Sequence, residues 1–211
     1  MAYDIEEQES LSALKGWLEE NANTLIVVIV VAVLAVAGSW GWRWYVQKEA
    51  SAAAVLFDEY TQAVDGKDES KARDTAAALM RDHASSAFAA FAALAQARVN
   101  VGKGDTTAAK AQLHFVIDRS GSAELVTLAR VRLAGVLLDE KAYDEGLAVL
   151  APEAPAALAA EVSDRRGDLL LAQGKPAEAR AAYAKALEEA GAQNPLRSLI
   201  QTKLDALPGA G

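Results

Sequence analysis

The chain has 211 residues, of which 52% are hydrophobic, and it carries a formal net charge of -8 with no cysteine. The length suits one membrane anchor followed by one domain of ordinary size. The lack of cysteine excludes disulfides and thiolate-based zinc sites, and the acidic balance without a basic stripe argues against nucleic-acid binding.

Residues 1–20 are predicted to form an acidic tail. They contain six of the 29 acidic residues and one of the 21 basic residues, Lys15. The rest of the chain therefore holds 23 acidic and 20 basic residues and has a net charge of only -3. The negative charge is thus concentrated at the N-terminus.

Residues 21–45 are predicted to form a transmembrane helix. No charged residue occurs from Asn21 to Trp42, a stretch that spans about 33 Å as a helix and matches the hydrocarbon thickness of a bilayer. Aromatic residues typical of the membrane interface flank it, with Trp17 on one side and four others on the far side: Trp40, Trp42, Trp44 and Tyr45. A buried core helix and a cleavable signal peptide are the alternatives. The acidic tail and the bulky aromatic end argue against a signal peptide.

The charges beside this segment leave its orientation open. Lys15 lies on one side, and Arg43 and Lys48 lie on the other. Counted literally, the positive-inside rule favours a cytoplasmic C-terminal domain by a margin of one charge. The small residues Ala37 and Gly41, four apart, have the spacing that lets a partner helix approach closely.

Residues 46–207 are predicted to form an all-α domain, and residues 208–211 a flexible C-terminus. Alanine is abundant and proline is rare, which favours uninterrupted helices, and no alternating run typical of a strand occurs after residue 46. Breaks about 12–20 residues apart separate the predicted helices. They lie near residues 65–67, 83–86, 102–105, 120–122, 139–141, 152–155, 173–175 and 191–195.

Similar turn sequences recur around Gly104, Lys141 and Gly174. Their spacing is close to the length of a tetratricopeptide helix pair, about 34 residues, and predicts an α-solenoid. An ordinary helical bundle is the alternative. Two positions in the repeats hold small residues that would let paired helices approach closely: Ala97, Ala134 and Gly167 before the turns, and Ala109, Gly146 and Ala179 after them. Leu113, Leu150 and Tyr183 are expected to fill the core between repeats.

The sequence contains no constellation typical of a catalytic or metal site. The two histidines, His83 and His114, have no other histidine within ligand spacing. The pair Arg165–Arg166 could bind a carboxylate or simply face water. We therefore expect a protein that is not an enzyme and that needs no cofactor and no metal.

The order of these segments resembles that of the YfgM family of bacterial inner-membrane proteins, which are ancillary subunits of the SecYEG translocon. The likeness covers the acidic tail with residues 9–17, the apolar span, the juxtamembrane sequence Gly41-Trp42-Arg43-Trp44-Tyr45 and the degenerate repeats. It implies a cytoplasmic N-terminus and a periplasmic repeat domain, an orientation opposite to the one favoured by the charge count.

The resemblance also implies two possible roles. The first is a scaffold beside SecYEG that pairs with a PpiD-like periplasmic chaperone, with emerging secreted chains as a further candidate ligand. The second is a regulator of an envelope-stress response that acts through the cytoplasmic tail.

Overall fold

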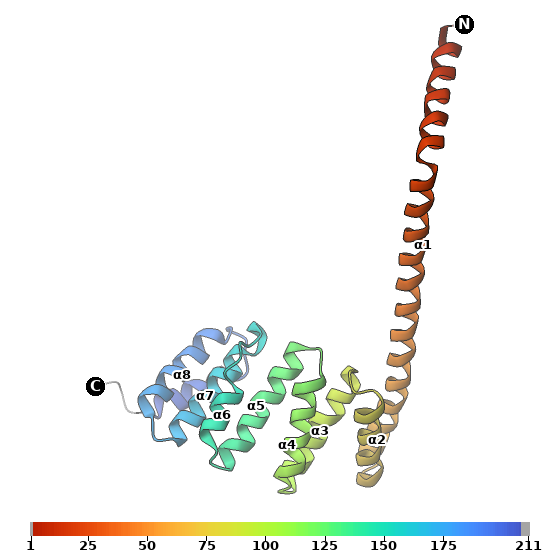
Figure 1. Ribbon diagram of the computed structural model, residues 1–211. Helices are drawn as coiled ribbons and strands as arrows, with labels where there is room; N and C mark the ends of the chain where they lie inside the picture. Colours follow the sequence, from red (N-terminus) through yellow and green to blue (C-terminus); the bar gives the residue numbers. More distant parts are fainter. Residues whose placement is uncertain (1, 208–211) are drawn as a thin grey trace. The chain divides into compact units, whose positions relative to one another are not determined.

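The computed structural model describes residues 2–207, so the predicted flexible C-terminus, 208–211, lies outside the described residues. The chain divides into two compact units, Met1–Ser51 and Ala52–Gly211. All regular elements in the described range are helical, as predicted (Figure 1).

The N-terminal unit is built on one helix. Helix α1 runs over Ala2–Asp65, so its greater part makes up nearly the whole unit and its end belongs to the second unit. The predicted limits of the anchor, 21 and 45, coincide with no break in the helix. Charged and apolar stretches both continue the helix because neither contains proline, and glycine alone costs only about 1 kcal/mol in a helix interior.

The C-terminal unit consists of successive helix pairs. After the end of α1 come α2 (Glu69–Asp82), α3 (Ala87–Gly102), α4 (Thr106–Arg119), α5 (Ala123–Asp139), α6 (Tyr143–Val149), the short 3-10 helix η1 (Ala156–Leu158), α7 (Ala159–Ala172), α8 (Pro176–Glu189) and α9 (Arg197–Asp205). The helices begin and end close to the breaks predicted from the sequence. Neighbouring helices along the chain lie side by side, as in a solenoid (Figure 1).

Local sequence explains where these helices start. Asp68, Ser86, Asp105 and Ser122 each precede a helix, and each side chain accepts a hydrogen bond from a backbone N–H three residues later. Such caps satisfy backbone donors that lack an intrahelical partner. Helix α8 begins instead with Pro176 at its first position, where a missing N–H costs nothing.

The turns within the helix pairs require left-handed backbone. Gly104 and Gly174 have φ angles of 78° and 77°, and Lys141 occupies the corresponding turn of the middle pair with a φ of 61°. Glycine adopts this conformation without the steric cost that lysine meets. The recurring turn sequences therefore mark a common backbone geometry.

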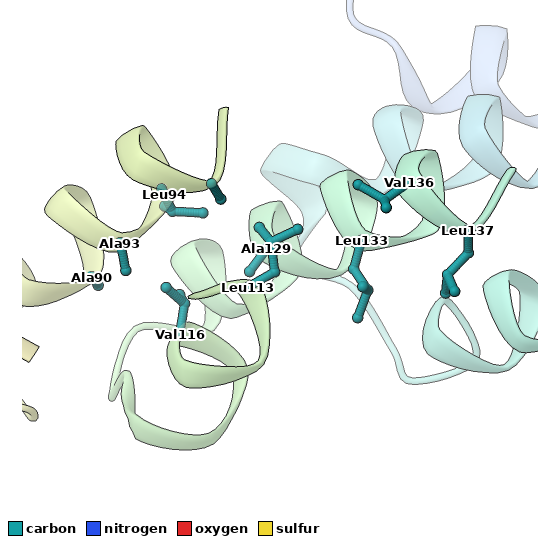
Figure 2. Packing of buried hydrophobic residues seen from close by; sticks show 10 residues of the cluster. Ala90, Ala93, Leu94, Leu113, Val116, Ala129, Leu133, Val136 and Leu137 are labelled. Atoms are coloured by element: carbon teal, nitrogen blue, oxygen red, sulfur yellow. The ribbon is translucent and has the colours of Figure 1, made fainter. Parts of the chain in front are cut away.

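The core is a succession of hydrophobic clusters between neighbouring pairs rather than one central mass. The largest joins α3, α4 and α5, and Figure 2 shows side chains of this cluster, among them Leu94 on α3, Leu113 on α4 and Leu133 on α5. A second cluster joins the end of α1 to α2 and α3, a third joins α5, α6 and α7, and a fourth joins α7, α8 and α9. Leu113, Leu150 and Tyr183 are each 1% exposed.

The middle pair is irregular. Helix α6 has only seven residues and no side-chain cap, and it ends at Val149 before an irregular segment that contains Pro152 and Pro155. Proline lacks the backbone N–H that would continue the helix. Leu150 nevertheless remains buried, so the short helix still contributes to the core of α5 and α7.

Candidate membrane anchor and interaction domain

Helix α1 presents the apolar surface expected of a membrane span. Among the described residues, it is the one helix long and apolar enough to cross a membrane, and none of its most apolar stretch is buried within the protein. Leu34 in the middle of that stretch is 65% exposed. Surface of this kind needs a nonpolar surrounding, which a bilayer supplies.

Tryptophans lie at both ends of the apolar stretch. Trp17 is exposed at one end, and Trp40, Trp42 and Trp44 are exposed at the other; the side chain of Tyr45 lies outside the described residues. The helix from Trp17 to Trp40 is about 35 Å long, a length that matches the distance between the two interfaces of a bilayer. The Lys48 ammonium lies 5.4 Å from the centre of the Trp44 ring.

The six small residues singled out in the repeats all lie in buried positions of the helix pairs. Ala109, Ala134 and Ala179 are fully buried and Ala97 is 2% exposed. A Cβ atom added to Gly146 would lie 2.8 Å from a methyl carbon of Leu169. One added to Gly167 would lie 2.6 Å from Cδ1 of Tyr183. Such distances are too short for a side chain, so these two glycines allow α6 and α8 to lie close to α7.

A polar network joins α7, α8 and the C-terminal helix α9. The Lys203 ammonium donates to both carboxylate oxygens of Asp164 and to Oδ1 of Asp168, each at 2.8 Å. The Tyr183 hydroxyl also donates to Asp168 at 2.8 Å. Asp164 is 8% exposed, and burial raises the pKa of its carboxyl group against the opposing effect of Lys203. This network fixes α9 on the last helix pair.

The sequence reasoning did not single out Asp164, Asp168 or Lys203. The sequence pattern marks these residues only weakly as members of a buried network, because lone charged residues in helices usually face water. Two acids four residues apart in the helix that carries Gly167 would have been the available clue.

Helix α7 also contains the arginine pair for which two interpretations were open. Arg165 donates to the Asp168 carboxylate of its own chain at 3.2 Å. Arg166 donates to the backbone carbonyl of Leu150 at 3.0 Å, where α6 ends. The interpretation that the pair simply faces water is therefore wrong.

Neither histidine belongs to a metal-binding cluster among the described residues. His83 follows the end of α2, and His114 is exposed on α4. The part of the chain that the structure describes contains no group of three or more His, Cys, Asp or Glu side chains arranged to bind a metal ion.

Comparisons with known proteins extend over nearly the whole chain. A tetratricopeptide repeat-like domain family matches residues 15–209. The chain is similar to three proteins named ancillary SecYEG translocon subunit. That of Haemophilus influenzae is 28% identical over 92% of this chain and 94% of its own length. That of Neisseria gonorrhoeae is 32% identical over 74% of this chain and 75% of its own length. That of Aggregatibacter actinomycetemcomitans is 30% identical over 98% of this chain and 100% of its own length. No solved structure shows a significant match.

Proposed function

Because this chain belongs to the family of ancillary SecYEG translocon subunits, we propose that it associates with SecYEG as a membrane-anchored, non-catalytic scaffold. The likeness to these relatives supports the proposal most strongly, since the alignment to one of them covers 98% of this chain, anchor and repeats together. A single apolar helix followed by a helical repeat domain suits a protein that holds a binding surface at a membrane.

The orientation in this proposal follows the family. The tail of residues 1–20 lies in the cytoplasm, the helix crosses the inner membrane, and the repeat domain lies in the periplasm. The charge count beside the span differs by only one residue and opposes this orientation weakly.

The finer role we propose is transfer of secreted chains from the translocon to a PpiD-like periplasmic chaperone. The anchor confines the repeat domain to the membrane surface, which raises its effective concentration near the translocon exit. A repeat domain offers an extended surface on which a chaperone and an emerging chain can both bind.

Copurification from mild detergent tests the association. The full-length protein is expected to recover SecYEG, and a variant whose span is replaced by an unrelated apolar helix of equal length is expected to recover less. That result would show contacts between helices within the bilayer, for which Gly38 and Gly41 leave open surface on α1. Absence of SecYEG from the full-length sample would contradict the proposal. If residues 1–20 then captured a cytoplasmic regulator, the stress-response role would replace it.

A further inference from the structure

Three arginines, each from the first helix of a pair, line one pocket of the repeat domain. The pocket has a volume of about 390 Å³, and Arg98 of α3, Arg132 of α5 and Arg165 of α7 all contribute to its wall. Val101 and Val136 provide aliphatic surface within it, together with Leu113. The pocket therefore combines a cluster of positive charge with apolar walls.

The repeat architecture brings these arginines together. The spacing from each arginine to the next is close to the length of one helix pair, about 34 residues, so each first helix of a pair supplies one guanidinium to the same face. The Arg132 side chain reaches back to α3 and donates to the carbonyl of Leu94 at 3.1 Å. Gly135 leaves the space beside Arg165 open, because a Cβ there would lie 3.5 Å from the Arg165 guanidinium carbon.

The positive charge in the pocket is poorly compensated. Arg98 makes no hydrogen bond or ion pair to any described residue, and Arg132 donates to a neutral backbone carbonyl rather than to a carboxylate. Arg165 shares the Asp168 carboxylate with Lys203 and Tyr183, and its buried Nε lacks a hydrogen-bond partner. Asp139 is the single carboxylate among the lining residues.

Two of these charges also repel each other. Burial, followed by the nearby Arg98 cation, lowers the pKa of Arg132. Arginine nevertheless stays protonated in proteins, so the repulsion is relieved by binding an anion rather than by losing a proton.

We propose that this pocket binds a carboxylate group of an extended peptide segment from a partner protein. The planar guanidinium matches a carboxylate in shape and charge and forms paired hydrogen bonds with it. The aliphatic walls favour a peptide over a small inorganic anion, because they accommodate an apolar side chain next to the carboxylate. The carboxylate belongs either to an Asp or Glu side chain or to a chain's C-terminus. This inference goes beyond the association with SecYEG and does not depend on it.

Peptide binding to the full-length protein in detergent micelles, followed by fluorescence anisotropy, tests the inference. Four short labelled peptides are compared: one with acidic and leucine residues and an amidated end, the same peptide with Asn and Gln replacing the acids, a neutral peptide with a free C-terminus, and its amidated form. At least one carboxylate peptide is expected to bind about tenfold or more tightly than its amide counterpart. The peptide that does so identifies the source of the carboxylate.

Variants then locate the binding. Arg98→Gln should weaken the carboxylate peptide about tenfold and leave the melting temperature unchanged, because the Arg98 side chain is exposed and unpaired. Gly135→Leu should weaken binding by filling the pocket without changing its charge. The matched control is Arg119→Gln, which removes the same charge from an exposed position at the end of α4.

Three results would overturn the inference. The first is that protein shown to be folded by cooperative thermal unfolding binds the carboxylate peptides and their amide counterparts with equal affinity. The second is unchanged binding in both Arg98→Gln and Gly135→Leu. The third is that the pocket binds inorganic phosphate but binds neither of the carboxylate peptides.

Discussion

At the residue scale, a few small side chains determine how closely neighbouring helices approach. Gly135 and Gly167 both lie inside first helices of a pair, but their surroundings differ. A Cβ on Gly167 would collide with the ring of Tyr183, whose hydroxyl is held by Asp168. A Cβ on Gly135 would make ordinary van der Waals contact with Arg165.

Alanine substitution at these two glycines should therefore act in opposite directions. Gly167→Ala is expected to destabilise the domain by about 1–3 kcal/mol, because Tyr183 must leave its position. Gly135→Ala is expected to stabilise it by about 0.5–1 kcal/mol, because alanine favours the helix and fits the space. Thermal unfolding of both variants measures the difference. A loss of stability in Gly135→Ala equal to that in Gly167→Ala would show that the close approach to Tyr183 is not decisive.

Tyr183 itself should give the domain a pH-dependent stability. Its side chain is 1% exposed, and burial together with the hydrogen bond to Asp168 raises its pKa above the ordinary value of 10.0. The unfolded chain then loses the phenol proton first as pH rises, so the stability contributed by Tyr183 is complete below pH 10 and declines above it. Tyr183→Phe retains the ring but lacks the hydroxyl.

We expect Tyr183→Phe to lower stability by about 1–3 kcal/mol at neutral pH, because Asp168 loses a charge-assisted donor. The difference between wild type and variant should shrink as pH rises above 10, and the comparison cancels the titration of the lysines common to both proteins. Unfolding measured from pH 7 to 11 provides the test. A constant difference over this range would contradict the role assigned to the hydroxyl.

At the element scale, local chemistry made most of the helix boundaries predictable. Aspartate, serine, glycine and proline mark helix ends through caps and turns, and these features depend only on neighbours in the chain. The extent of α1 was not predicted, because a change from apolar to charged residues does not by itself end a helix. The arginine pocket and the network around Lys203 were not predicted either. Each brings together polar side chains from three helices, and the proximity of these side chains depends on how successive pairs pack.

Helix α9 offers a test of such packing at the level of one element. Lys203→Met leaves Asp164 and Asp168 without their shared cation, and we expect a loss of about 2 kcal/mol, since the lysine side chain is 24% exposed and the pair is only partly desolvated. Hydrogen exchange should accelerate over residues 197–205 while α3 to α5 keep their protection.

The matched control is Lys185→Met. Lys185 pairs with Glu189 on the surface of α8, with its side chain 58% exposed, so its loss should cost less than about 0.5 kcal/mol. If Lys203→Met changed exchange no more than this control, the network would not be what holds α9 in place.

At the scale of the whole molecule, the chain combines a span that needs a bilayer with a repeat domain that buries its own core. The repeat domain buries many of its apolar side chains in its own hydrophobic clusters. The most apolar stretch of α1, in contrast, is not covered by any other described residue. The two parts meet different solvents, and the function proposed for them depends on which side of the membrane each part occupies. Membrane orientation is therefore the central property to measure.

The absence of cysteine allows this orientation to be measured with single labels. Ser10→Cys places a thiol in the acidic tail, and Ser70→Cys places one at an exposed position of α2. With the tail in the cytoplasm, a membrane-impermeant maleimide should label Ser70→Cys in intact spheroplasts and Ser10→Cys only after lysis. The lysed samples show that both thiols react when accessible. Labelling of Ser10→Cys alone in intact spheroplasts would show that the topology is the inverse of the one proposed. The one-charge excess at Arg43 and Lys48 would then have determined the orientation, and a periplasmic chaperone could no longer be the partner of the repeat domain.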